Sequence, residues 1–136
     1  MPRSLIEKPQ TQQLTVDQAL HLAIQHHQAG KLREAEQLYL AILSIQPNHA
    51  WANHNIGILA SQCGNHKAAL FYQERATQAI PGNIMFANDY AYALSSNGFQ
   101  ERALEVFRKN LESDPDNLAS INGVGVCLLL AGDLDR

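Results

Sequence analysis

The pattern of apolar and polar positions along this chain repeats every 34 residues. The clearest unit runs from a glycine through an amphipathic segment to a proline and reads G-N-H-K-A-A-L-F-Y-Q-E-R-A-T-Q-A-I-P over residues 64–81. The same unit returns over residues 30–47 and 98–115. Apolar residues at intervals of three and four within each unit predict an amphipathic helix. The chain is therefore built from an internal repeat.

Four columns of residues keep this register. Glycines stand at positions 30, 64, 98 and 132, and prolines at positions 47, 81 and 115. Small residues lie at a fixed distance before and after each glycine: Ala23, Gly57, Ala91 and Gly125 before it, and Ala35, Ala69 and Ala103 after it. Small side chains at equivalent positions let neighbouring helices approach closely, so every repeat is expected to pack in the same way.

Each repeat is predicted to hold two helices separated by short turns. The first helices are expected over residues 16–29, 50–63, 84–97 and 118–131, and the second helices over residues 32–46, 66–80 and 100–114. Glycine can adopt the left-handed conformation that closes a helix, and proline disfavours helical geometry in the residue before it. Thr15 and Gln18 form a capping-box pattern, and Asn48, Asn83 and Asn117 stand where later N-caps are needed.

Short connections make neighbouring helices antiparallel, and a single pair cannot bury its own apolar face. The pairs are therefore predicted to stack into an all-α solenoid. Residues 1–14 are polar, contain two prolines and are expected to form a flexible lead-in to a domain over residues 15–136. The repeats would span residues 16–49, 50–83, 84–117 and, in part, 118–136. The expected shared core consists of Leu22, Leu38, Ile56, Tyr72, Tyr90, Val106 and Val124.

Together these features resemble the tetratricopeptide repeat family. The small residue at position 8, glycine at 15, alanine at 20 and proline at 32 match its pattern when position 1 is placed at Val16, Ala50, Ile84 and Leu118. Tyr39 and Phe107 match the family's aromatic residue at position 24, whereas Gln73 departs from it. The resemblance implies a right-handed helical solenoid of antiparallel helix pairs with about 3.5 repeats.

Composition excludes several classes of function. The formal net charge is −3 and the chain has no basic run, so nucleic acid is not an expected partner. No apolar run is long enough to cross a membrane, and the first residues lack the apolar core of a signal peptide, so the chain is expected to be cytoplasmic. Cys63 and Cys127 lie far apart and are read as reduced thiols.

Charge is distributed unevenly between the two kinds of helix. Across the predicted first helices the only charged residues are Asp17 and Asp89, whereas the second helices carry many charges of both signs. In tetratricopeptide folds the first helices line the concave groove. The resemblance therefore implies a nearly uncharged groove inside a charged and hydrated exterior.

The groove-facing positions give a candidate site for a peptide or a partner helix. Amide side chains both donate and accept hydrogen bonds, so a row of them can pair with an extended backbone, and aromatic and aliphatic neighbours can hold apolar side chains. The alternative is that these amides only hydrate the groove or cap local backbone. The candidate residues are Ile24, Trp51, His54, Asn55, Ile58, Asn88, Asp89, Tyr92, Asn122 and Val126.

Other kinds of site find no support. Some family members clamp acidic tails with Lys, Asn and Arg at set positions, but Leu20, Ile24, Met85 and Asp89 stand at four of them here and only Asn55 fits. The six histidines do not form a pair spaced for a metal, and there is no nucleophile motif or phosphate-binding loop. The chain is therefore expected not to be an enzyme and to need no cofactor or metal.

The last predicted helix is uncharged over residues 118–131, and repeat four breaks off soon after it. An exposed apolar helix end favours self-association, so Leu128, Leu129 and Leu130 are predicted to pair with a second copy in a homodimer. The other interpretation is that the chain is the N-terminal region of a larger bacterial protein.

Two further functions stay open. The run A-E-Q-L-Y-L-A-I-L-S-I-Q-P-N-H-A followed by N-H-N-I-G-I-L-A resembles repeats that precede glycosyltransferase or sulfotransferase domains. This chain would then be the substrate-targeting arm of a multidomain enzyme. Its size and repeat number also resemble those of small secretion or pilus-assembly chaperones.

Overall fold

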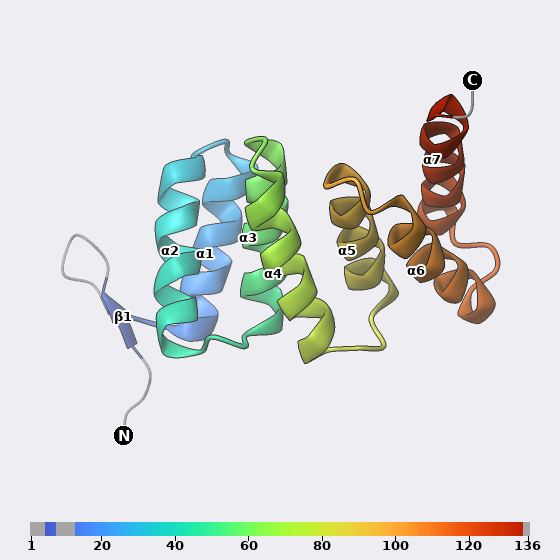
Figure 1. Cartoon of the computed structure of the whole chain (residues 1–136). Coiled ribbons are helices and arrows are strands. Elements are labelled where there is room, and N and C mark those ends of the chain that lie inside the picture. The colour runs from blue at the N-terminus through green and yellow to red at the C-terminus, as the bar shows by residue number, and fades with distance from the viewer. Residues whose placement is uncertain (1–4, 8–12, 135–136) are drawn as a thin grey trace.

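Helices joined by short turns make up almost all of the computed structural model, which describes residues 5–7 and 13–134 (Figure 1). The six helices before residue 114 each begin where the sequence predicts and end one residue earlier. The observed helices are α1 (Val16–Gln28), α2 (Leu32–Ile45), α3 (Ala50–Gln62), α4 (His66–Ala79), α5 (Ile84–Ser96), α6 (Gln100–Ser113) and α7 (Leu118–Leu134). The prediction of an all-α solenoid of helix pairs is confirmed.

Glycines close the first helix of each complete repeat, as predicted. Gly30, Gly64 and Gly98 have φ angles of 80°, 79° and 88°, where only glycine avoids a steric penalty. The expectation that Gly132 ends the last helix is wrong, because α7 continues through it to Leu134. A glycine permits the left-handed turn but does not impose it, and it can also remain inside a helix.

Two of the three asparagine caps are confirmed. Asn83 Oδ1 accepts a hydrogen bond from the Phe86 backbone N–H at 2.9 Å, and Asn117 caps α7 in the same way. Asn48 does not cap α3, because the 34-residue register places the cap at His49, whose Nδ1 accepts from the Ala52 N–H at 3.1 Å.

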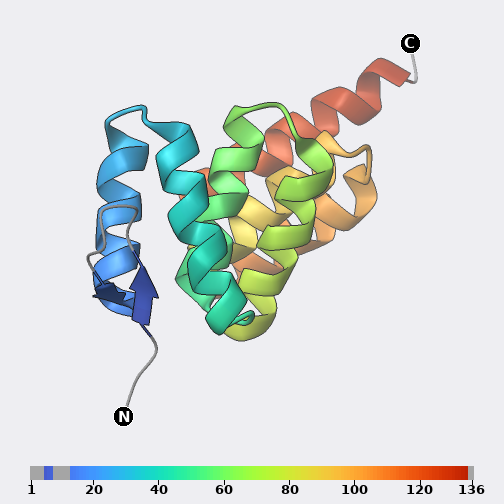
Figure 2. The same cartoon turned by 90° about the vertical axis from the view of Figure 1, so that its left-hand side faces the viewer.

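A short antiparallel ribbon precedes the helices. Strands β1 (Leu5–Glu7) and β2 (Gln13–Thr15) pair with Leu5 opposite Thr15, and the ribbon lies beside α1 (Figure 2). The prediction of a flexible lead-in is therefore wrong for residues 5–7 and 13–14, while residues 1–4 and 8–12 lie outside the described residues. Half-buried Leu14 packs against the helical core, which gives the ribbon an apolar anchor that the polar composition concealed. Thr15 ends β2 and forms the predicted capping box with Gln18.

The core is built from the small columns and a few large side chains. Ala23, Ala35, Ala91 and Ala103 are fully buried, and Ala69 is nearly so, which confirms the close approach predicted at these positions. The prediction is wrong for Gly125, which is exposed on α7 with no atom within 4 Å of an added Cβ. Of the expected shared core, Leu38 and Ile56 are buried, whereas the other five residues are half-buried and pack against its edge. The largest fully buried side chains are instead Tyr39, Phe86, Phe107, Ile42 and Leu94.

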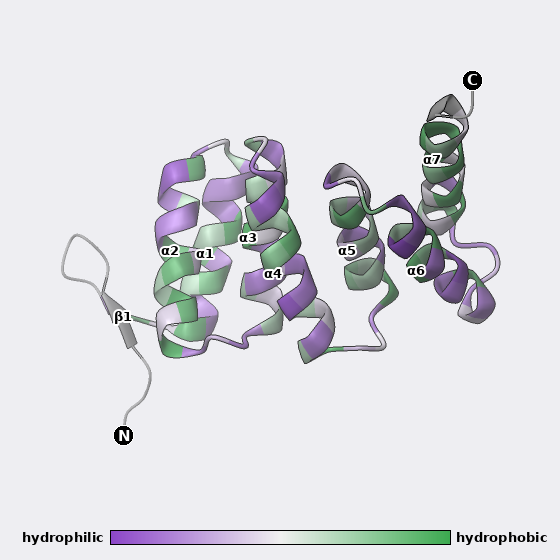
Figure 3. Cartoon of the chain, in the orientation of Figure 1, coloured by the Kyte–Doolittle hydropathy of each residue, from purple (hydrophilic) through white to green (hydrophobic). Residues whose placement is uncertain are grey.

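Hydropathy differs sharply between the last two helices. Figure 3 shows α6 mostly hydrophilic and α7 largely hydrophobic. Along α7, Leu128, Leu129 and Leu130 are 49%, 70% and 43% exposed, as the sequence predicts for an uncovered apolar helix.

Candidate functional site

A hollow lies between the first helices of repeats two and three. It has a volume of about 180 Å³, and we call it the α3–α5 hollow. Four lining residues come from α3, four from α5, and two from the underlying helix α4. They are Gly57, Ile58, Ser61, Gln62, Ala69, Gln73, Asp89, Tyr92, Ala93 and Ser96. The hollow therefore sits on the face formed by the first helices, which we call the inner face.

The floor of the hollow differs from the other repeats at one column. Tyr39 in α2 and Phe107 in α6 are fully buried rings, whereas repeat two has Gln73 at the equivalent position. A Cβ added to Gly57 would lie 2.6 Å from Gln73 Nε2, so the side chain needs a glycine opposite it. Gln73 therefore replaces the aromatic ring with a polar floor, and Gly57 leaves the room that its side chain needs.

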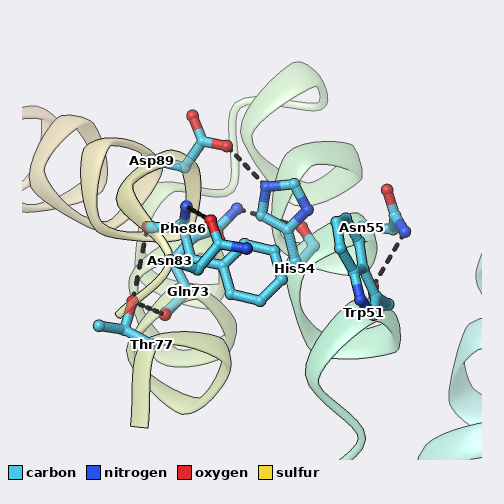
Figure 4. A network of polar contacts seen from close by, with 8 residues as sticks. All are labelled: Trp51, His54, Asn55, Gln73, Thr77, Asn83, Phe86 and Asp89. Atoms are coloured by element: carbon cyan, nitrogen blue, oxygen red, sulfur yellow. Dashed lines mark hydrogen bonds and ion pairs between the residues drawn. The ribbon is translucent and has the colours of Figure 1, made fainter. Parts of the chain in front are cut away.

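A buried histidine and an aspartate on the neighbouring helix form the central polar contact. His54 Nε2 lies 2.7 Å from Asp89 Oδ2, while His54 is only 3% exposed (Figure 4). The imidazole stacks on Phe86 with centroids 4.5 Å apart, and Trp51 meets it edge-on at 5.8 Å. These rings fix the imidazole, and the imidazole in turn orients the Asp89 carboxylate.

One ring nitrogen of His54 faces the carboxylate and the other faces the interior. Because a carboxylate oxygen can only accept, Nε2 carries a proton and donates to Asp89. Nδ1 is buried and has no hydrogen-bond partner among the residues that the structure describes.

Tyr92 forms the wall toward the C-terminal helix. Its hydroxyl donates to the Ala119 carbonyl at 3.0 Å, and its ring meets Phe107 edge-on with centroids 5.0 Å apart. Burial raises the pKa of Tyr92, and the nearby Cys127 and Asp89 raise it further, so the phenol stays protonated. The α5 side of the hollow is thus fixed to α7.

Gln62 at the other rim is held by a contact with repeat one. His27 Nε2 lies 2.8 Å from Gln62 Oε1, and His27 Nδ1 lies 3.0 Å from the Tyr39 hydroxyl. Burial raises the pKa of Tyr39 to about 12, so this phenol remains a donor and His27 Nδ1 accepts. His27 Nε2 then donates to Gln62, which links the hollow to α1 and α2.

Asn88 does not line the inner face, contrary to the sequence hypothesis. It is 4% exposed, and its Oδ1 accepts hydrogen bonds from Asn110 Nδ2 at 2.9 Å and Ser120 Oγ at 2.8 Å. Its Nδ2 donates to Asn117 Oδ1 at 3.1 Å. This amide is satisfied inside the protein, where it joins α5, α6 and α7, and cannot be part of a row that captures a peptide.

The other predicted residues divide between the hollow and the wider inner face. Ile58, Asp89 and Tyr92 line the hollow. His54 does not line it but contacts Asp89, which does. Asn55 donates its amide to the Trp51 carbonyl at 2.9 Å, one turn earlier on the same helix (Figure 4). Trp51 is 41% exposed, Ile24 is half-buried on α1, and Asn122 and Val126 are exposed on α7.

Four polar lining residues were missed by the sequence hypothesis, namely Ser61, Gln62, Gln73 and Ser96. For Gln73 there was a signal, because it breaks an otherwise aromatic column. Ser61 also had a signal, because it stands at position 12 of the repeat, which was expected to face the groove. Gln62 and Ser96 had none, because they stand near helix ends where polar residues are ordinary. Within residues 5–7 and 13–134 no three His, Cys, Asp or Glu side chains gather closely enough to hold a metal ion. In the same part of the chain, no helix has the length and apolarity to span a membrane.

Comparisons with known proteins point to one family. The family model described as "Tetratricopeptide repeat" matches residues 52–83, which cover most of α3, all of α4 and the turn after it. A curated relative is Protein FlbA of Caulobacter vibrioides, 27% identical over 112 residues, which cover 82% of this chain and 19% of that protein.

Solved structures with the same fold include an enzyme and a peptide-binding domain. A mutant O-GlcNAc transferase of Thermobaculum terrenum matches with a TM-score of 0.74 and 26% identity over 83% of this chain and 22% of the enzyme chain. The first TPR of Spaghetti (RPAP3), bound to an HSP90 peptide, matches with a TM-score of 0.79 and 14% identity over 86% of this chain and 93% of that chain. This chain therefore spans about a fifth of FlbA and of the transferase, and it matches the repeat part of the enzyme.

Proposed function

Because this chain belongs to the tetratricopeptide repeat family, we propose that it is a protein–protein interaction module that binds a peptide or partner helix along its inner face. The match over residues 52–83 supports the proposed repeat boundaries at 50–83, with equivalent units at 16–49 and 84–117. The observation that carries the proposal is the α3–α5 hollow, a recess between two successive first helices.

The lining of the hollow suits a protein ligand. Ile58 and Tyr92 provide apolar walls, while Ser61 and Ser96 place hydroxyl groups at an exposed rim. Trp51 and Met85 add apolar surface on the same helices, 41% and 47% exposed. Exposed aromatic and apolar groups next to a few oriented polar groups are typical of sites where a partner anchors one or two side chains. In Spaghetti, the related fold holds an HSP90 peptide.

Blocking the hollow is expected to abolish binding. Short random peptides displayed on phage would be selected against the wild-type chain, and the strongest one synthesised with a fluorescent label. Ser61→Trp places an indole in the hollow without removing a core side chain, because Ser61 is exposed. Fluorescence anisotropy should show binding weakened by about tenfold or more, the usual cost of losing a central contact.

Ser44→Trp is the matched control. Ser44 is exposed on α2, away from the inner face, so this variant should keep its affinity to within about twofold. Equal losses in both variants, or a selected peptide that neither affects, would place the binding surface elsewhere. Failure to select any peptide would count against the whole proposal.

We also propose that α7 pairs with a second copy of this chain. Residues 118–132 contain no charged side chain, so two such helices can meet without like-charge repulsion. Leu129→Glu should convert a dimer of about twice the chain mass into a monomer, because it places a carboxylate in the paired face. Light scattering over a dilution series gives the mass.

Leu40→Glu on α2, where Leu40 is 45% exposed, is the control and should remain dimeric. A monomeric wild-type chain would contradict the proposal.

A second candidate function is the substrate-targeting arm of a larger enzyme. The match to an O-GlcNAc transferase at 26% identity over 22% of that chain favours it. Under this proposal the inner face would bind a substrate protein and present it to a catalytic domain elsewhere in the polypeptide. Sequencing the intact gene would test it: a glycosyltransferase or sulfotransferase-like domain following these repeats would support it, and a reading frame without one would remove it.

A further inference from the structure

The lining of the α3–α5 hollow carries charge of one sign. Asp89 is the only carboxylate among its ten lining residues, and none of them is Lys or Arg. One carboxylate oxygen contacts His54, while Figure 4 shows the other pointing away from that ring. The side chain is 34% exposed, so a ligand can reach it.

The floor offers a buried acceptor without a partner. Gln73 is 3% exposed, and its Nε2 donates to the His54 carbonyl at 3.1 Å. Because a carbonyl needs a donor, this contact fixes the amide orientation and leaves Oε1 as an acceptor. Oε1 is buried and has no hydrogen-bond partner among residues 5–7 and 13–134, so a ligand that donates to it would remove the cost of an unpaired acceptor.

The remaining polar atoms also favour a donor ligand. The Tyr92 hydroxyl already donates a hydrogen bond to the Ala119 carbonyl, so toward a ligand its oxygen can only accept. The Ser61 and Ser96 hydroxyls can accept, whereas the amide N–H₂ groups of Gln62 and Gln73 can only donate, and that of Gln73 already donates to the His54 carbonyl. A carboxylate and several acceptors around a small space suit a group with positive charge and several N–H donors.

We propose that the α3–α5 hollow binds a basic side chain, Arg or Lys, of the protein segment that lies along the inner face. The inference rests on the proposed function and adds the chemistry of its ligand. The cation pairs with Asp89 at the rim and donates toward Gln73 on the floor. The specificity is opposite to that of a clamp for acidic tails, which needs basic residues that this hollow lacks.

The test uses the peptides selected against the wild-type chain. We expect Arg or Lys to be enriched at one position, and exchange of that residue for uncharged citrulline or norleucine to weaken binding by about tenfold. For Asp89→Asn the affinities of the charged and uncharged peptides should differ by no more than about twofold, because the carboxylate that attracts the basic residue is absent. Asp17→Asn is the control, since Asp17 is the other acidic residue of α1, α3 and α5 and should leave the tenfold difference intact.

The outcomes separate this inference from the proposed function. Peptides that bind and are blocked by Ser61→Trp, yet show no basic residue or no loss on its exchange, would overturn the inference and leave the function standing. Absence of any binding peptide would overturn both. If Asp89→Asn does not fold, as judged by circular dichroism, the exchange measured on the wild-type chain decides alone.

Discussion

Phe107→Ala is expected to lower the free energy of unfolding by about 3–5 kcal/mol, the usual loss for a buried aromatic ring. Phe107 is fully buried in the core shared by α5, α6 and α7, and its ring lies edge-on to Tyr92. A Cβ added to Gly123 would lie 2.3 Å from the ring, so the glycine leaves room that the phenyl group fills. Removing the ring creates a cavity that the backbone cannot close. Urea unfolding followed by circular dichroism gives the difference.

Phe71→Ala is the control for the same change of residue type. Phe71 is 54% exposed on α4, where it meets Tyr72 edge-on and Arg75 at 5.3 Å. Its loss should cost about 1 kcal/mol or less, as is usual for surface positions. Similar losses for Phe71 and Phe107 would mean that the C-terminal repeat is not packed as described. A loss that depends on protein concentration would mean that α7 pairing contributes to the measured stability.

The helices were predictable because their boundaries depend on local signals. Glycine, proline and the capping asparagines act within a few residues of their own positions, and the 34-residue register repeats these signals along the chain. The two failures have different origins. Asn48 was assigned as a cap from its residue type, although the 34-residue register places the cap at His49. At Gly132 the glycine was taken to require a turn that it only permits.

The candidate site was only partly predictable because adjacent helical residues point in directions about 100° apart. Asp89 lines the hollow, whereas Asn88, one residue earlier, points into the interior. The partners that bury Asn88 are Asn110 and Ser120, which lie 22 and 32 residues away. No periodicity within one helix shows that such partners exist. The assignment of both residues to one face therefore failed for Asn88.

Gln73 shows what a departure from a repeat can indicate. In the sequence, Gln73 stands where the other repeats have an aromatic residue. The sequence could not show that Gly57 makes room for the amide, or that the amide oxygen has no partner in the part of the chain that the structure describes. Both facts depend on how α3 and α4 pack together. The departure from the aromatic pattern thus located the floor of the hollow. Only the packing of α3 against α4 showed that this floor presents an unpaired acceptor.

Asn88→Ala is expected to lower the free energy of unfolding by about 2–4 kcal/mol, because it leaves buried donors on Asn110 and Ser120 without their acceptor. Each unpaired buried group costs more than an ordinary hydrogen bond contributes, and the Asn88 amide joins three helices. The measurement is again urea unfolding. In the fraction that remains folded, the affinity for a selected peptide should change by no more than about twofold, because Asn88 does not reach the hollow.

Asn55→Ala is the matched change on the neighbouring first helix. The Asn55 amide donates only to the Trp51 carbonyl of its own helix, so its loss should cost about 0.5 kcal/mol or less. If Asn88→Ala instead weakens peptide binding strongly while stability is unchanged, the amide must leave the interior when a ligand binds, and the row of asparagines along the inner face would be restored. If stability falls and affinity holds, Asn88 secures the α5–α7 wall of the hollow, and ligand recognition rests with Asp89 and its neighbours.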